Sequence, residues 1–475
     1  MPVVVTDPGQ AGHRIRPHDG SLLLTTTRAR LALALIFLFL YVPFVVDHGF
    51  GLASARNVDL PSFYYASDAA FNGQISPYAP AAWQRLQQQL GQPVFPFLYP
   101  PPSLLLFLPF SWFSYASVKI AVLLANHVSL LALLYLLLFR ILTVTRPPAA
   151  AERNQPGTFL MGWITLPLLL LYMLQFHPVV VTLGHGQVNL TVLVLLALFW
   201  VALRERRPGA LTALPLAGAI LLKTYPALFL PLLLIRRRWR TAGWTAAYLA
   251  GAVGVSWAVL PRQAWSDWFR VVLPTGGYAN EPLGLLSPAM PWNQSVNGFA
   301  ARLFLNPVYA AHPNPLLARV VPWLAAAAIV GTLVWLAVRL TRRQETRYLN
   351  DEFVTVLLSM FLIAPLSWEH HLVFVLPAAM LALLQLMGGS LSLRASLGVG
   401  LVVFVLAWPM GFVFRIQGTG PLSLLVSLKF YAVLALWGYF VRRLVKISRG
   451  QPVAGAEERP VTAAAARRMR RSTSA

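Results

Sequence analysis

Long apolar runs separated by short basic clusters divide the 475-residue chain. A helix needs about 20 apolar residues to cross a bilayer, and we expect about ten such spans. The spans are predicted at residues 29–48, 116–140, 159–177, 188–203, 243–260, 319–338, 352–367, 371–388, 396–414 and 421–441. The pattern therefore predicts an all-α polytopic membrane protein.

Two further apolar stretches are interrupted by proline or by charge. Residues 103–114 follow "FPFLYPPP" and are too short and too proline-rich for a crossing, so we expect an interfacial or re-entrant helix there. Residues 209–235 have basic flanks at both ends and "LLKTYPALF" in the middle. We expect two short helices that meet near Lys223 and Pro226 as a broken hairpin.

The composition agrees with a membrane protein. Hydrophobic residues make up 57% of the chain and charged residues only 11%, whereas a soluble domain carries about 25% charged residues. The formal net charge is +23, but the basic residues lie in short clusters between apolar runs. That distribution is typical of cytoplasmic loops and argues against a nucleic-acid partner. Because the sequence has no cysteine, disulfides, thiol catalysis and cysteine-based zinc sites are excluded.

Placing the basic clusters in the cytoplasm sets the topology. We expect a cytoplasmic tail over residues 1–28, a transmembrane domain over 29–444 and a disordered basic cytoplasmic tail over 445–475. Residues 49–115 and 261–317 then form two long segments, carrying short helices, on the outer face of the plasma (inner) membrane.

With this topology, four polar stretches collect on the outer face. Asp59 and Asp68 lie in the first outer segment, and "LGHGQVN" (183–189) lies at a turn between two spans. "PWNQSVNGFAARLF" (291–304) belongs to the second outer segment, and "SWEHH" (367–371) to another outer turn. Ionisable groups are costly at a membrane, so these residues are candidates for function.

Asp59 has two interpretations. It precedes Pro61 at the start of a predicted helix over 61–72, which suits a helix N-cap. It could equally be a base that removes a proton from a hydroxyl nucleophile. Asp68 lies two and a half turns later, on another helix face. That separation argues against a paired-carboxylate hydrolase.

The His370–His371 pair also leaves several interpretations open. It could be a polar turn, an interfacial anchor with Trp368, or part of a metal site completed by His185 or Asp59. It could also supply one histidine that hydrogen-bonds a substrate or orients the base. Adjacent helical residues point about 100° apart, so one site would use only one of the two.

Several motifs together resemble glycosyltransferase family 87. "VDLPSFYYASDAAFNGQISPYAP" and "FLYPPPSLLLFLPF" are similar to its opening signature, and "GQVN", "LLKTYP" before "RRRWR", "NQS" with "NGF", and "APLSWEHH" follow in the family order. The resemblance covers about residues 29–390. Two departures, Leu60-Pro61 in place of the usual phenylalanine and an extra proline in "YPPPS", bear only on local geometry.

The resemblance implies a GT-C-type fold and transfer of a sugar from a polyprenyl-phosphate donor. By analogy with the family's polyprenol-phosphate-mannose-dependent α-(1→2) mannosyltransferases, the expected sugar is mannose. The resemblance also implies Asp59 as general base and a histidine of the pair, His371 slightly favoured over His370, in an inverting reaction. The expected substrate-binding residues are Tyr64, Tyr65, Asp68, Tyr78, Gln187, Asn189, Lys223, Asn293, Asn297, Arg302, Trp368 and Glu369.

Lys223 has a second interpretation, because it could snorkel to a lipid headgroup instead of neutralising the donor phosphate. The outer segments contain no Asp-x-Asp, and we expect neither a metal nor an organic cofactor. The expected partners are the donor, a glycolipid or polysaccharide acceptor and membrane lipid.

Two other functional classes compete with a transferase. A flippase for polyprenyl-linked glycans would need polar residues along several spans, and here the spans are nearly uncharged. A histidine-dependent acyltransferase would prefer an acyl donor on the cytoplasmic side, where the chain offers mostly arginine.

Overall fold

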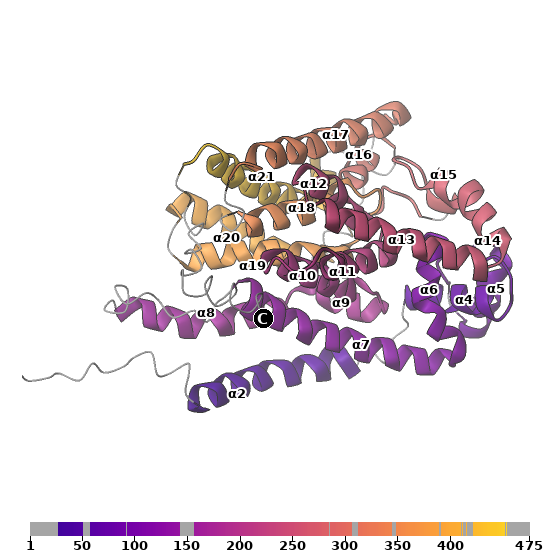
Figure 1. The fold of residues 1–475 in the computed structure, drawn as a ribbon, viewed down its shortest axis with the longest axis horizontal. Coiled ribbons are helices and arrows are strands. Elements are labelled where there is room, and N and C mark those ends of the chain that lie inside the picture. Colours follow the sequence, from indigo (N-terminus) through magenta and orange to yellow (C-terminus); the bar gives the residue numbers. More distant parts are fainter. Residues whose placement is uncertain are drawn as a thin grey trace, which may run out of the picture.

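The computed structural model describes residues 27–50, 58–91, 93–142, 156–284, 286–305, 312–343, 348–388, 391–409, 411, 415, 421–451 and 453. Across these ranges the regular structure is helical, as predicted. Long helices run side by side, and the short helices α4, α5, α6, α14 and α15 gather at the right-hand end in Figure 1. The predicted tails lie almost entirely outside the described residues.

The first half of the bundle contains both long and very short helices. They are α2 (Thr27–Phe44), η1 (Val45–Phe50), α4 (Leu60–Phe71), α5 (Pro80–Leu90), η2 (Pro101–Ser103), α6 (Leu104–Phe107), η3 (Leu108–Trp112), α7 (Tyr115–Tyr135), η4 (Leu136–Ile141), α8 (Pro156–Leu174), α9 (His177–His185) and α10 (Asn189–Arg204). The region 103–114 thus forms consecutive short helices, none of them long enough to span a bilayer.

The second half begins with the predicted broken hairpin. Its elements are α11 (Gly209–Leu222), η5 (Tyr225–Leu228), α12 (Phe229–Ile235), α13 (Trp239–Val259), α14 (Arg262–Asp267), η6 (Trp268–Val272), α15 (Leu273–Thr275), η7 (Pro282–Gly284), α16 (Val296–Phe304), α17 (Pro315–Leu340), α18 (Leu349–Ile363), η9 (Glu369–Val375), α19 (Leu376–Met387), α20 (Leu393–Ala407), η11 (Pro421–Ser427) and α21 (Leu428–Ser448). The break falls at Lys223, whose backbone is extended. Helix α21 continues past residue 445, where we expected the tail to begin.

The ten predicted spans are not confirmed. Within the described residues, four helices are long and apolar enough to cross a membrane: Tyr115–Ile141, Pro315–Leu340, Glu369–Met387 and Leu424–Ser448. A bent pair, Thr165–Leu174 with His177–His185, makes a fifth if it counts as one span. Other apolar helices, such as α10 and α20, are shorter because polar residues and turns end them early.

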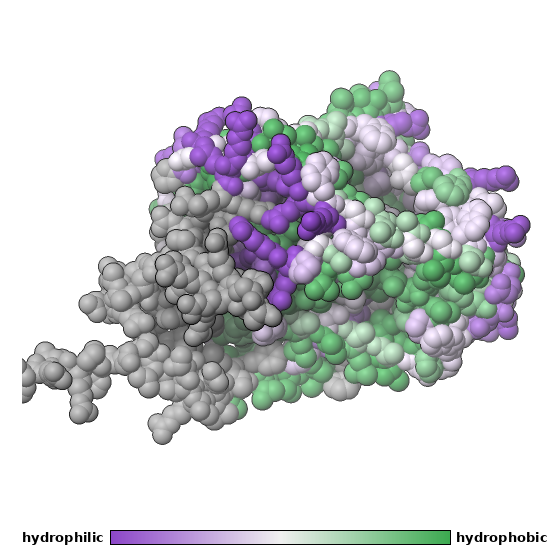
Figure 2. All heavy atoms as spheres, viewed as in Figure 1, coloured by the Kyte–Doolittle hydropathy of each residue, from purple (hydrophilic) through white to green (hydrophobic). Residues whose placement is uncertain are grey.

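Charged side chains join several helices at one end of the bundle. The contacts are the ion pairs Arg140–Glu205, Arg236–Glu352 (2.6 Å) and Arg443–Asp351 (3.1 Å), and a hydrogen bond from Trp200 to Asn350 (3.1 Å). They link α10, the end of α12 and the C-terminal part of α21 to the start of α18, and η4, which follows α7, to the end of α10. Hydrophilic residues gather at the left of Figure 2, whereas much of the visible flank is hydrophobic.

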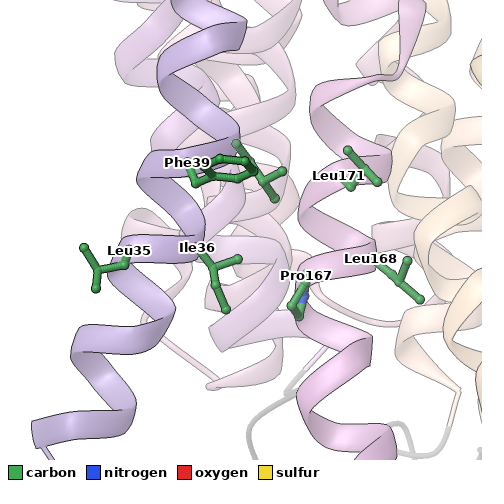
Figure 3. A pocket seen from close by; sticks show the side chains of 7 residues that line it. Leu35, Ile36, Phe39, Pro167, Leu168 and Leu171 are labelled. Atoms are coloured by element: carbon green, nitrogen blue, oxygen red, sulfur yellow. The ribbon is translucent and has the colours of Figure 1, made fainter.

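An apolar crevice of about 540 Å³ lies between α2 and α8. Leu35, Phe39 and Leu171 are among the side chains that line it, and Pro167 within α8 narrows one side (Figure 3). Its lining is entirely hydrophobic, as expected of a surface in contact with lipid tails.

Arg443 provides a test of the buried charge layer. Arg443→Met would leave the buried Asp351 carboxylate unpaired, and breaking a buried pair in this way costs about 3–5 kcal/mol. We expect a clear fall in the unfolding temperature of the detergent-solubilised protein. Arg207→Met, which breaks an exposed pair with Glu205, is the control and should cost under about 1 kcal/mol. Equal losses in both variants would contradict this assignment.

Candidate active site

Asp59 lies directly before α4, but its side chain does not cap that helix. The helix begins at Leu60 with Pro61 in its first turn, as the sequence suggested, yet no capping hydrogen bond forms. The Asp59 Oδ2 atom instead lies 3.2 Å from Nδ1 of His185. The N-cap position is therefore occupied by a carboxylate that faces another helix.

A close backbone approach holds Asp59 against the end of α9. The Asp59 amide donates a hydrogen bond to the His185 carbonyl, 3.1 Å away. Gly186 ends α9 with a φ of +66°, and a Cβ placed there would lie 2.7 Å from Leu60 Cβ. Glycine is favoured at position 186 for two reasons: its backbone is left-handed, and Leu60 leaves no room for a side chain.

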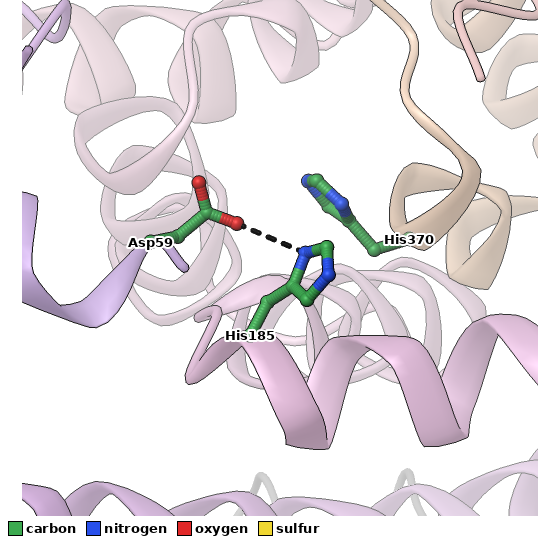
Figure 4. A group of neighbouring side chains, drawn as sticks. All are labelled: Asp59, His185 and His370. Carbon is green, nitrogen blue, oxygen red and sulfur yellow. Dashed lines mark ion pairs between the residues drawn. The ribbon is translucent and has the colours of Figure 1, made fainter. Parts of the chain in front are cut away.

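His370 completes a cluster with Asp59 and His185. The three side chains point toward one another from separate parts of the chain (Figure 4), and one ligand atom from each lies within 4.8 Å of the others. The His370 carbonyl accepts hydrogen bonds from Thr182 and Asn189, both 3.1 Å, which fixes the histidine against α9 and α10. The imidazole rings of His185 and His370 are 5.1 Å apart.

Several polar atoms in this cluster are buried without a well-formed hydrogen bond to the described residues. They are Asp59 Oδ2, His185 Nδ1, His370 Nε2, Gln187 Oε1 and Asn189 Oδ1. Asp59 Oδ2 and His185 Nδ1 face each other at 3.2 Å, whereas the other three atoms have no partner among the described residues. Buried polar atoms normally have partners, so this group indicates a site for a polar ligand.

The protonation of Asp59 follows from its neighbours. Burial raises the pKa of Asp59, but the side chains of His185, His370 and Gln187 outweigh that effect and hold the pKa below its ordinary value. The carboxylate is therefore ionised at neutral pH. Nitrogen and oxygen ligands at these separations could also bind a divalent cation such as Zn²⁺. The expectation of a metal-free reaction stays a prediction.

Lys223 and His371 form a second polar pair. Lys223 is almost fully buried, and its Nζ atom lies 2.9 Å from Nε2 of His371. The ring centroids of Tyr99 and Tyr225 lie 5.3 and 5.9 Å from the ammonium nitrogen, within cation–π range. The adjacent histidines thus have different surroundings, and His370, not the favoured His371, belongs to the Asp59 cluster.

The predicted residues of the first outer segment mainly hold its fold. The hydroxyl of Tyr65 accepts a hydrogen bond from the Phe97 amide, and Tyr78 donates one to the Tyr99 carbonyl. Asp68 accepts from Asn72, and Tyr64 donates to the Phe113 carbonyl. The buried hydroxyls of Tyr65 and Tyr78 are thus engaged with backbone groups.

The predicted residues of the second outer segment also make internal hydrogen bonds. Asn293 and Asn297 donate to the Pro365 carbonyl, 3.2 and 2.8 Å away. Arg302 donates to two backbone carbonyls and to Ser427. These contacts hold the segment against the turn that leads to Trp368, whose ring centroid lies 6.4 Å from that of Trp292.

Glu369, Lys429 and His177 form a third polar group, of which only Glu369 was predicted from the sequence. Its Oε1 atom accepts from Lys429, 2.5 Å away, and lies 3.1 Å from Nδ1 of His177. Lys429 falls inside the predicted span 421–441. A lysine within a membrane span indicates a functional site or an ion pair, so the sequence could have identified it. His185 was considered only as a metal ligand, although it stands in the quoted "LGHGQVN".

The fold and the site together define an integral membrane protein with a histidine–carboxylate cluster between its helices. Residues 97–365, more than half of the chain, match the family model of glycosyltransferase family 87. The chain belongs to this family. His185, Gln187 and Lys223 lie inside the matched range, whereas Asp59 and His370 lie outside it.

The relatives carry closely similar names. The chain is 29% identical over 296 residues to a polyprenol-phosphate-mannose-dependent α-(1-2)-phosphatidylinositol mannoside mannosyltransferase of Mycolicibacterium smegmatis, covering 59% of this chain and 60% of the relative. It is 26% identical over 286 residues to the enzyme of the same name from Mycobacterium tuberculosis, covering 60% of this chain and 61% of the relative. The alignments thus span about three fifths of each relative's length. No solved structure matches the chain.

Gly186 is the sharpest local test of the site. In Gly186→Ala, the left-handed backbone costs about 1–2 kcal/mol, and the new methyl group pushes against Leu60. We expect Asp59 to shift relative to His185, with a loss of activity larger than the loss of thermal stability.

Gly91→Ala is the matched control, because Gly91 is also left-handed (φ +59°) but no heavy atom lies near its Cβ position. It should lose stability alone. An active Gly186→Ala enzyme would contradict the proposed importance of this contact.

Proposed function

We propose that this protein transfers mannose from a polyprenyl-phosphate donor to a glycolipid acceptor on the outer face of the membrane. The observation that carries the proposal is the buried cluster of Asp59, His185 and His370, with unsatisfied polar atoms facing one another. The donor and the phosphatidylinositol mannoside type of acceptor come from the names of the relatives, which are mannosyltransferases dependent on polyprenol-phosphate-mannose.

In the proposed reaction, the acceptor hydroxyl attacks the anomeric carbon of the donor sugar. The new carbon–oxygen bond forms while the bond to the phosphate oxygen breaks, and polyprenyl phosphate leaves with the electron pair. Asp59 takes the hydroxyl proton, and one displacement inverts the anomeric centre, so a β-linked donor gives an α-linked product. Because Asp59 is a weak base, proton transfer becomes favourable only as the new bond forms.

His185 and His370 orient the carboxylate in this account. The backbone hydrogen bond from Asp59 to His185 fixes one side, and the carbonyl of His370, held by Thr182 and Asn189, fixes the other. Lys223, close to the cluster and paired with His371, is placed to neutralise the phosphate that leaves. Electrostatic stabilisation of this kind is strongest in a buried, preorganised site.

The charge distribution supports an outer location for the site. Basic clusters follow α7, α10 and α12, and ion pairs join these helix ends at one end of the bundle. The positive-inside rule assigns that end to the cytoplasm. The short helices of the two long polar segments lie at the opposite end (Figure 1), so we place the catalytic cluster on the outer side.

The flippase reading is less well supported. Lipid-linked glycan would have to pass between leaflets, which calls for polar groups along the whole path. Here the polar candidates gather around Asp59 and Lys223, while the charges of the opposite end are paired with one another.

Replacing Asp59 tests the proposed base. Asp59→Asn keeps the size and polarity of the side chain but cannot accept the proton, and we expect the transfer rate to fall about 10²–10⁴-fold. The measurement is transfer of radiolabelled mannose from polyprenyl-phosphate-mannose to extracted lipid acceptors.

Glu281→Gln, at an exposed carboxylate of the second long polar segment, should transfer at the wild-type rate. Wild-type transfer by Asp59→Asn would remove Asp59 from the base role. If wild type moves lipid-linked glycan between leaflets without transferring sugar, the enzyme proposal fails.

Chelation tests the metal-free expectation. Asp59 acting as a free base predicts that transfer survives incubation with EDTA and is not raised by added Zn²⁺ or Mn²⁺. His185→Gln offers a second readout, because it removes a candidate metal ligand and keeps a polar neighbour for Asp59. Loss of transfer on chelation, with recovery on adding metal, would show that the cluster works as a metal site.

A further inference from the structure

A long apolar groove of about 950 Å³ lies along α7, α10 and α11. Its lining residues on α10 run from Val188 to Glu205 at intervals of mostly three or four, which is one helix face. These two residues are seventeen positions apart, or about 26 Å at 1.5 Å per residue. The groove therefore extends over most of the roughly 30 Å hydrocarbon core of a bilayer.

One end of the groove is lined by residues that adjoin the candidate active site along the chain. Leu222 lines the groove and is followed by Lys223, the buried cation paired with His371. Val188 lines it from a position next to Gln187, whose side chain lies beside Asp59. This end of the groove is therefore the end nearer the cation and the carboxylate.

The other end of the groove is lined by charged side chains. Arg140, Glu205 and Arg207 line it there, and Glu205 is ion-paired with both arginines. The lining between the two ends is mostly aliphatic and aromatic. A groove with an apolar lining and Lys223 near one end fits a molecule with one anionic end and a long apolar chain.

Small residues make room in the middle of the groove. Ala121 and Ala125 contribute from α7, and Gly218 contributes from α11. A Cβ on Gly218 would lie 3.4 Å from a methyl group of Leu195, so a larger side chain at residue 218 would contact α10. Exposed leucines, such as Leu211, line the groove as well, so it opens toward surrounding lipid.

We propose that this groove holds the isoprenoid tail of the lipid-phosphate donor, with the phosphate at Lys223. The inference rests on the proposed function and adds where the donor lipid binds. A bilayer is as apolar as the groove, so burial itself contributes little. The contribution of the groove is orientation, because a tail fixed along α10 holds the sugar–phosphate bond beside Asp59. The crevice between α2 and α8 has no lining residue that neighbours a site residue along the chain, and it receives no such role.

Groove-filling variants test this assignment. Ala125→Trp and Gly218→Leu place bulk in the groove from opposite walls. Leu124→Trp, one position along α7 and outside the groove lining, and Gly251→Leu, with open space around its Cβ position, are the matched controls. KM and kcat are measured with a long-chain and a short-chain polyprenyl-phosphate-mannose, after thermal unfolding in detergent has shown that each variant folds.

We expect the groove-filling variants to raise KM for the long-chain donor about tenfold, with a smaller change in kcat. Their KM for the short-chain donor, and both KM values of the controls, should stay at the wild-type level. Folded groove variants with an unchanged KM for the long-chain donor would overturn the inference. A rise in the KM of the acceptor alone would also overturn it and assign the groove to acceptor acyl chains.

Failure of the proposed function would look different, since wild type would then transfer sugar from neither donor. The groove is tested in that case with polyprenyl phosphate that carries a photoreactive diazirine on its tail. Labelled peptides from α10 and α11 in wild type, and fewer in Ala125→Trp, would support the tail site. Equal labelling of the two proteins would contradict it.

Discussion

The contact between the start of α4 and the end of α9 is the constraint on which the site depends. Asp59 and His185 share a backbone hydrogen bond, and their side chains approach to 3.2 Å. The contact is possible because residue 186 is glycine, which leaves space for Leu60. The second histidine, on η9, is attached to the same α9 through Thr182. Asp59, the turn at Gly186 and His370 are thus brought together at the C-terminal end of α9.

Charge in an apolar environment explains much of the remaining architecture. The buried ions Lys429, Arg443 and Arg236 each contact a carboxylate, because an unpaired charge in such surroundings is costly. Asp59 is different, since no lysine or arginine of the described residues forms an ion pair with it and several polar atoms around it lack well-formed hydrogen bonds. The ion-paired residues therefore hold helices together, whereas Asp59 is available to a ligand. A buried lysine and an apolar groove beside it give such a ligand both a headgroup site and a tail site.

Sequence patterns predicted the helical class, the break at Lys223 and the short helices around residue 104, because proline and charge interrupt hydrophobic runs locally. Asp59 became the main candidate through the expected topology and the resemblance to the family's opening signature. Sequence patterns could not decide between His370 and His371, since that choice depends on how η9 packs against α9. Asn293 and Arg302 stay predicted ligand residues, and the structure adds that their side chains bond to backbone carbonyls of nearby turns, which only tertiary contacts reveal. The ten spans stay a prediction, because several apolar stretches of the described residues form helices of 10–17 residues, shorter than a typical crossing.

Chemical rescue of a variant without the carboxylate tests the central claim most directly. Asp59→Gly removes the proposed base and leaves space near His185, where a small external carboxylate such as formate can act as the base in its place. The measurement is the rate of mannose transfer by this variant with and without formate, compared with His185→Ala under the same conditions. The account predicts that Asp59→Gly is inactive alone and gains transfer with formate, whereas His185→Ala gains nothing. Wild-type transfer by Asp59→Gly without formate would contradict the account.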